Sequence, residues 1–483
     1  MKFSKNKIRL FAGLVFLSLI FICLRLKTIN HLLMWDEAWN ILSLRAYVLN
    51  AAGDPFYWFY YYHPPFYMAF ARILSPLAGG FDVRLELLSL VFCYGTFLTV
   101  YLISAKTGGW RYAWFTGLFL SFMPCSIGYD TWIKRDSLAS LLGYLALLLL
   151  LNRRFMWCAV SLSFSLLSKE NGIFFVLSAF LMLFVLGEKR PIRKILSMGL
   201  VILALCSWWY VFFSKMTTHG ARFFSAGTKY ALVWANEPLY FVKKLLPDLG
   251  TGILFFLVIG LCFLPYKAFF RKKPGWFLPV MVVLCVYIPV SFFFTLKPPW
   301  LILPALPALA MTAGGGALYL LRRAGRSRIL YPALLIFLAI TVFNGLYFSY
   351  EGYHTETYPK GWPGARASRE LALYLNERMK DDDRLMITGF EYWQMPTCPI
   401  FLYYWKQHPI KTIRSSERSK DVIDEIIKKN ISWFVVVGTP DPSAESNFRK
   451  LAEDFSYQTG QRPGIAGWSY VWKTDALWKD REN

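Results

Sequence analysis

The sequence predicts an α-helical polytopic membrane protein, with about eleven transmembrane helices, that ends in a soluble α/β domain. Of its 483 residues, 56% are hydrophobic, whereas a soluble domain has ~45–50%. Apolar runs of about bilayer length recur along the first 350 residues and then stop. The net charge is +23. Its Lys and Arg residues lie mostly in short runs between apolar segments. This distribution favours a role in membrane topology and in contact with anionic lipid over a role in nucleic-acid binding.

A helix needs ~20 apolar residues to cross a bilayer core, and most of the apolar runs are close to that length. Two consecutive runs near the middle of the chain are short, and they could instead form one kinked helix or a re-entrant element. The candidate spans are residues 8–26, 85–105, 110–127, 138–151, 155–168, 172–186, 195–213, 252–270, 276–296, 300–321 and 329–350.

Basic residues recur at every second turn between these spans. The positive-inside rule places such turns in the cytoplasm. They contain Arg153 and Arg154, residues 189–194, residues 271–273 and residues 322–328. The segment before the first span is also basic, and that span lacks a clear cleavage site, so we expect a retained helix. With eleven spans, the N-terminus lies in the cytoplasm and the C-terminus lies on the outer side of the cell membrane, that is, the inner or plasma membrane.

The composition becomes ordinary and polar after residue 350. Residues 385–389 and 433–438 are β-rich runs, and residues 367–379 and 421–429 have amphipathic patterns. Alternating β and α signals predict a small domain with a partly parallel sheet. The expected division is therefore a membrane domain over residues 1–350 and an extracytoplasmic domain over residues 351–483. Neither a Gly-rich phosphate loop nor a zinc-type cysteine spacing appears, so we predict no nucleotide site and no structural metal.

Two adjacent carboxylates, Asp36 and Glu37, follow the first span between Trp35 and Trp39. A carboxylate beside apolar surface can acquire a raised pKa and act as a general base. The alternative is a solvated acid pair with aromatic membrane anchors. Further along the same loop, Tyr62 and His63 precede two prolines and an amphipathic segment over residues 66–77, which predicts a helix on the membrane surface.

Four cations fall on the predicted outer side, against the positive-inside pattern. They are Lys134, Arg135, Lys169 and Lys297. Misplaced cations suggest an anion site such as a phosphate. The alternatives are local salt bridges, of Lys134 and Arg135 to Asp130 or Asp136 and of Lys169 to Glu170, and snorkelling of Lys297 to the headgroups.

In this order, the motifs resemble the GT-C glycosyltransferases, especially the branch with protein O-mannosyltransferases and the aminoarabinose transferase of lipid A. The matching elements are Asp36-Glu37, His63-Pro64-Pro65, Ser168-Lys169 opening a mid-chain helix, and Lys297 before the run 303–310. The chain departs from that pattern at His63, where relatives often carry Lys, and at residues 298–300, where they often carry Arg-Tyr.

The resemblance implies a membrane glycosyltransferase that transfers a sugar from a polyprenyl-phosphate donor to an acceptor hydroxyl on the extracytoplasmic face, with inversion. Asp36 would be the catalytic base and Glu37 a positioning acid. The four outer cations would bind the donor phosphate, and Trp35, Tyr62 and His63 would line the pocket. We expect no cofactor; a divalent metal is possible but not favoured.

The partners implied are the lipid-linked sugar, membrane lipids, and a lipid, polysaccharide or protein acceptor. The rival reading is a lipid or glycan transporter or flippase, since broken helices and intramembrane charges also suit one. Against it, the chain has no inverted repeat, and its acids cluster in loops rather than at mid-membrane.

Overall fold

The chain forms two compact units in a computed structural model. One contains residues 1–30 and 46–355, and the other contains residues 31–45 and 356–483. Residues 31–45 therefore group with the tail, although the expected division at residue 350 stays a prediction. The residues described are 5–29, 35–48, 66–74, 81–216, 239–292, 299–324, 329–349, 365–380, 382–388, 401, 405, 410–412, 419–437, 442–459, 463–466 and 469–474.

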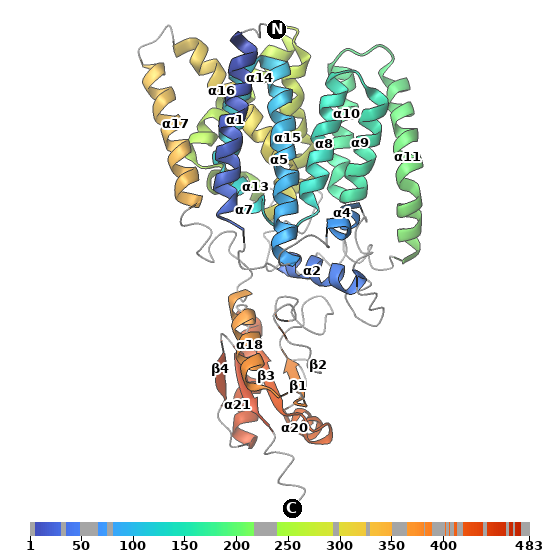
Figure 1. The fold of residues 1–483 in the computed structure, drawn as a ribbon, viewed down its shortest axis with the longest axis vertical. Helices are drawn as coiled ribbons and strands as arrows, with labels where there is room; N and C mark the ends of the chain where they lie inside the picture. Colours follow the sequence, from blue (N-terminus) through green and yellow to red (C-terminus); the bar gives the residue numbers. More distant parts are fainter. Residues whose placement is uncertain are drawn as a thin grey trace, which may run out of the picture. The chain divides into compact units, whose positions relative to one another are not determined.

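The first unit is a bundle of roughly antiparallel helices (Figure 1). Each predicted span overlaps one of them, which confirms the polytopic fold class. Among the described residues, seven helices are long and apolar enough to cross a membrane, and three more apolar helices are shorter. The bundle contains α1 (Lys5–Leu26), α5 (Phe81–Gly108), α6 (Trp110–Phe122), α8 (Asp136–Leu151), α9 (Phe155–Ser168), α10 (Ile173–Val185), α11 (Pro191–Met216), α14 (Thr251–Phe269), α15 (Leu278–Phe292), α16 (Leu306–Ala324) and α17 (Leu330–Tyr347).

Two expectations about the spans are wrong in detail. The span over residues 110–127 is broken, because α6 ends at Phe122 and a separate short helix, α7 (Pro124–Tyr129), begins at a proline. Ser168-Lys169 does not open a helix, because Ser168 is the last residue of α9. The short pair of spans forms two helices joined by Lys169 and a 3-10 turn, η1 (Glu170–Gly172).

The turns rich in Lys and Arg lie together at the end of the first unit where α1 begins, which we call the basic end (Figure 1). The opposite end, where α1 finishes, is called the site end. Two short amphipathic helices, α4 (Phe66–Leu74) and α13 (Tyr240–Leu249), lie there. The predicted surface helix thus starts at the expected residue, and residues 75–77 lie outside the described part of the chain.

Helix α16 is the most enclosed long helix of the bundle, with 94% of its apolar stretch buried. Small residues allow α14 to approach it closely. A Cβ placed on Gly316 would lie 2.0 Å from the Phe256 carbonyl oxygen, and one on Gly260 would lie 1.9 Å from that of Thr312. The backbones are therefore in contact, as in other membrane helix pairs with small residues at the interface.

We expect Gly316→Ala to destabilise the bundle, because the new methyl group must push α14 away from α16. Overpacking of this kind typically costs ~1–3 kcal/mol. The measurement is the thermal unfolding midpoint of the detergent-purified protein. Gly199→Ala is the matched control, since Gly199 lies in α11 and a methyl group added there would have no described atom within 4 Å. Equal midpoints for the two variants would contradict this account of the packing.

The second unit contains a five-stranded sheet in the order β2-β1-β3-β5-β4. Strands β1 (Leu385–Thr388), β2 (Ile410–Thr412) and β3 (Trp433–Val437) are parallel, whereas β5 (Ser469–Lys473) is antiparallel to β3 and to β4 (Gly464–Ala466). The helices are α18 (Ala365–Arg378), α20 (Ser419–Lys428) and α21 (Pro442–Thr459). This confirms the predicted α/β fold with a partly parallel sheet. Helix α2 (Trp35–Val48) belongs mainly to this unit.

Candidate functional site

The break between α6 and α7 shapes the site end of the bundle. Pro124 has no N–H group, so the carbonyl of Leu120 loses the donor that a continuous helix would provide. Arg25, at the end of α1, replaces it. Its Nη2 donates to the Leu120 oxygen at 2.9 Å, and its Nη1 donates to that of Ser121 at 3.0 Å. The side chain of one helix therefore caps the end of another.

The remaining donors of Arg25 connect it to α7. Its Nε donates to Asp130 Oδ2 at 2.6 Å, and its Nη2 also donates to Ser126 Oγ at 2.9 Å. Ser126 in turn donates to Asp130 Oδ2 at 2.7 Å. The guanidinium lies 3.6 Å from the centroid of the Phe21 ring and is fully buried. A buried charge is tolerated only when it is paired and hydrogen-bonded in this way.

A second ion pair lies at the start of α8. Asp136 is the first residue of that helix, where a carboxylate interacts favourably with the helix dipole. Its Oδ2 accepts a hydrogen bond from Lys169 Nζ at 2.5 Å, and its Oδ1 accepts one from Asn171 Nδ2 at 2.9 Å. Asp136 is 1% exposed at the side chain and Lys169 is 16% exposed. Lys169 therefore pairs with Asp136, from another helix, at the turn between α9 and α10.

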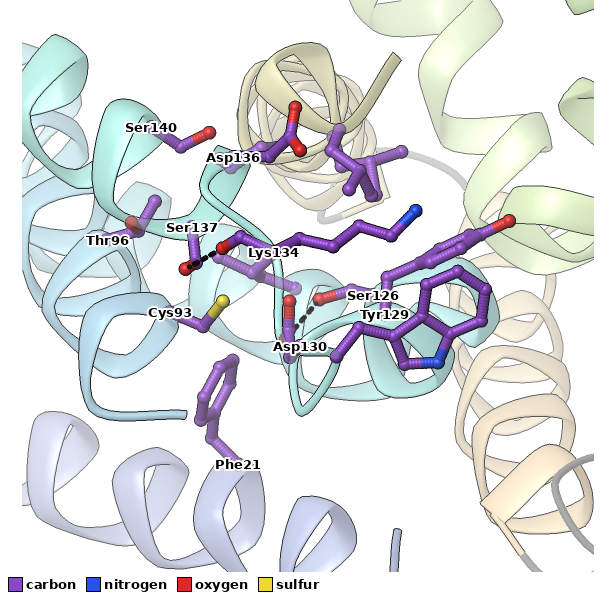
Figure 2. Close-up of a pocket in the computed structure, with 15 residues that line it drawn as sticks. Phe21, Cys93, Thr96, Ser126, Tyr129, Asp130, Lys134, Asp136, Ser137 and Ser140 are labelled. Atoms are coloured by element: carbon purple, nitrogen blue, oxygen red, sulfur yellow. Dashed lines mark hydrogen bonds between the residues drawn. The ribbon is translucent and has the colours of Figure 1, made fainter. Parts of the chain in front are cut away.

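Between these two ion pairs lies a cleft, the site cavity, of ≈ 490 Å³ including its open mouth. Its walls come from α1, α5, the α6–α7 break, the start of α8 and the start of α16. Figure 2 shows the side chain of Lys134 extending across it, between Asp136 on one side and Ser126 on the other. The lining residues are Phe21, Cys93, Thr96, Leu120, Ser126, Tyr129, Asp130, Trp132, Lys134, Asp136, Ser137, Ser140, Leu303, Leu306 and Pro307.

Lys134 is the predicted site residue that most directly faces this cavity. It is 4% exposed, and its Nζ lies 4.5 Å from the centroid of the Trp132 ring. The cavity therefore combines this cation with hydroxyl groups, a wall that is mostly apolar, and two carboxylates, Asp130 and Asp136, that are each paired with another cation. Such a combination can accept a phosphate attached to a lipid, because the cation offsets the anionic charge while the apolar wall contacts the chain.

The other predicted site residues are placed as follows. Arg135 is buried beside Lys134 but does not line the cavity, and Lys169 pairs with Asp136 at its edge. Glu37 is fully buried in α2. Asp36 and Trp35 open that helix, and their side chains lie outside the described residues. Tyr62, His63 and Lys297 also lie outside the described residues. The roles assigned to all of them stay predictions.

Sequence reasoning missed Arg25 altogether. A signal was present, since Arg25 stands at the outer end of the first span, where the positive-inside rule disfavours a cation. The two acids considered as alternative partners of Lys134 and Arg135 pair with cations of other elements, Asp130 with Arg25 and Asp136 with Lys169. No group of three potential metal ligands occurs among the described residues.

No protein-family model and no curated sequence matches this chain. Solved structures do match it in fold. ArnT from Cupriavidus metallidurans in the apo state aligns over 96% of this chain and 98% of its own, with a TM-score of 0.67 and 15% identity. The same protein bound to undecaprenyl phosphate aligns over 95% and 97%, with a TM-score of 0.62 and 17% identity.

The oligosaccharyltransferase of Archaeoglobus fulgidus, tethered to an acceptor peptide, aligns over 95% of this chain and 72% of its own, with a TM-score of 0.58 and 15% identity. ArnT and this enzyme are both GT-C glycosyltransferases. The chain therefore has the GT-C fold, as the resemblance of its motifs led us to expect.

Proposed function

We propose that this GT-C-fold membrane protein is a glycosyltransferase that moves a sugar from a polyprenyl-phosphate donor to an acceptor hydroxyl. The observation that carries the proposal is the alignment over nearly the full length of both chains with ArnT bound to undecaprenyl phosphate. It is supported by a cavity at one end of the bundle that contains Lys134 and opens beside apolar helices. The identity of the sugar and of the acceptor stays open, because folds do not determine substrates.

The donor phosphate is the leaving group of this reaction. It departs as an anion, so it needs a cation to offset its charge rather than a strong general acid. Lys134, which is 4% exposed, supplies that charge at the cavity wall. Lys134 lines the site cavity, whereas Arg135 and Lys169 do not. We therefore rank Lys134 first among the four predicted phosphate-binding cations, ahead of Arg135, Lys169 and Lys297.

The acceptor hydroxyl must lose a proton as it attacks the sugar. A single positioned carboxylate can remove it. Asp36 is the proposed base and Glu37 the proposed positioning acid, because Asp130 and Asp136 already accept hydrogen bonds that hold helices together. A single displacement by the hydroxyl inverts the configuration of the anomeric carbon. The proposal includes no cofactor and no metal ion.

Transfer of a radiolabelled sugar tests this function directly. Proteoliposomes containing the purified protein would receive a polyprenyl-phosphate sugar and an extract of the host envelope as acceptor. We expect label to leave the lipid fraction and to enter an acceptor fraction, with free polyprenyl phosphate as the second product. Movement of intact labelled donor between leaflets, with no transfer, would support a flippase and contradict the proposal.

Lys134→Gln should reduce transfer at low donor concentration by about 10²-fold, as expected when one donor to a developing anion is lost. The reason is that Gln retains much of the length of the side chain but not its charge. Initial rates against donor concentration measure the effect. Lys244→Gln provides the control, because Lys244 is an exposed cation in the site-end helix α13 outside the cavity. Equal rates for the two variants would move the phosphate site elsewhere.

The proposal also requires the site end to face away from the cytoplasm. A tag after Asn483 and a tag in the turn of residues 189–194 should then be accessible from opposite sides of the membrane. The physical reason is the concentration of Lys and Arg in turns at the basic end. Protease protection in intact spheroplasts, with lysed spheroplasts as the control, measures this. If instead the tag in residues 189–194 is cleaved in intact spheroplasts and the tag after Asn483 is protected until lysis, the site end faces the cytoplasm.

A further inference from the structure

The sequence between residues 249 and 350 contains no Asp or Glu, although it holds nine cations. Six of them lie in described residues at the basic end, near the C-terminal ends of α14 and α16. Lys267 is within electrostatic range of Arg271, Lys273 and Arg322. We call these four residues the α14–α16 cluster. Lys267 is half-buried, and the other three lie in more open positions.

Aromatic rings lie beneath this cluster. The Lys267 Nζ lies 5.5 Å from the centroid of Phe263, and the Arg271 guanidinium lies 5.9 Å from that of Tyr266. The buried Trp276 packs edge-on against Phe263, with 5.8 Å between the ring centroids. Ring faces attract cations, so these contacts hold the long side chains near one another. These contacts do not neutralise the positive charge of the cluster.

The described part of the chain provides little opposing charge near this cluster. Two helix C-termini contribute the equivalent of about −0.5 each, against four positive side chains. The neighbouring basic turn is different, because Glu188 forms ion pairs with Arg153 and Lys194 there. Along the sequence, Glu188 is the only acid in the basic turns between the apolar spans. Among the described residues, no ion pair joins a carboxylate to the α14–α16 cluster, so its counter-charge comes from solvent ions or from a bound ligand.

The surface beside the cluster indicates what carries that charge. Leu261, Phe269 and Phe270 on and after α14 are 41%, 56% and 78% exposed, and Ile329 before α17 is 80% exposed. Exposed apolar side chains next to clustered cations fit a molecule with an anionic head and hydrocarbon chains. A free phosphate ion would use the cations but would leave this apolar surface uncovered.

We propose that the α14–α16 cluster binds the headgroup of an anionic phospholipid, whose acyl chains lie along the exposed face of α14. Binding would hold together the ends of the two helices that pack most closely in the bundle. The site is at the basic end, opposite the site cavity, so it is separate from the donor site and does not depend on the proposed function.

Lipid-dependent thermal stability of the full-length protein tests the proposal. The detergent-purified protein would be titrated with phosphatidylglycerol, with phosphatidylcholine and with inorganic phosphate, and its unfolding midpoint followed by Trp fluorescence. A ligand that binds only the folded state raises the midpoint in a saturable way. We expect phosphatidylglycerol to do so at low mole fraction, and the other two to have little effect at the same concentration.

The test variant is Lys267→Gln/Arg271→Gln/Arg322→Gln. Each cation near an anionic lipid surface contributes about a five-fold factor to binding, so the half-saturating lipid concentration should rise at least ~10-fold. The matched control is Arg154→Gln/Lys189→Gln/Arg193→Gln, which removes the same charge at the same end around Glu188 and should respond like the unmodified protein. The single variant Arg322→Gln should show a smaller rise in the same direction.

Three outcomes would overturn the proposal. One is an equal loss in both triple variants, which would mean a diffuse attraction between the basic end and lipid. Another is a phosphatidylglycerol response that survives in the cluster variant. The third is an equal response to inorganic phosphate, which would mean an anion site that does not recognise lipid. Counting of retained lipids by native mass spectrometry provides an independent readout if the triple variant is poorly stable.

Discussion

Replacing Asp36 by Asn should leave a folded, membrane-inserted protein that binds donor but transfers sugar ~10²–10⁴-fold more slowly, which is the usual effect of losing a general base. Asn retains the shape of the side chain and much of its hydrogen bonding, but it cannot accept the proton. Asp36 is the second residue of α2. A carboxylate there could merely interact with the helix dipole, at ~0.3–1 kcal/mol. Loss of a catalytic base would therefore slow transfer far more than loss of an interaction with the helix dipole.

Single-turnover transfer and donor binding, measured on the same preparation, separate these roles. Glu370→Gln is the control, because Glu370 is an exposed acid on α18 of the same unit. We expect Glu37→Gln to have a smaller effect on the rate than Asp36→Asn. Near-normal transfer by Asp36→Asn would exclude this residue as the base, and Glu37, Asp130 and Asp136 would be tested next, in that order.

Arg25→Met should destabilise the bundle by ~3–5 kcal/mol, the usual result of removing one member of a buried ion pair. The change leaves Asp130 without its cation and the carbonyls of Leu120 and Ser121 without their donors. Chemical or thermal unfolding in detergent measures the loss. Lys27→Met is the matched control, because Lys27 lies two residues further along and is exposed. A similar stability for both variants would contradict the capping role of Arg25.

A second substitution shows whether the cost comes from the charge left behind. In Arg25→Met/Asp130→Asn, the carboxylate that lost its cation is gone, so part of the stability should return. The two uncapped carbonyls remain in both variants. We therefore expect the double variant to be more stable than Arg25→Met but less stable than the unmodified protein.

The helical bundle could be predicted because its signal is local. Apolar runs such as residues 85–105 and 252–270 satisfy the length requirement of a bilayer by themselves, and the basic turns between them fix their alternation. The runs at 385–389 and 433–438 similarly predicted β1 and β3, which are apolar and central in the sheet. The shorter strands β2 and β4 were not predicted, since three residues give too weak a pattern.

The site was only partly predictable, because its geometry depends on distant partners. The sequence by itself identified Lys134 and Lys169 as cations in unusual positions, and Asp130 and Asp136 as acids close to Lys134. Only the tertiary structure decided that Asp130 pairs with a residue 105 positions away and Asp136 with one 33 positions away. Hydropathy and periodicity report the preference of each segment for lipid or water. Ion pairs inside a bundle depend instead on which helix ends meet, and that is determined by packing.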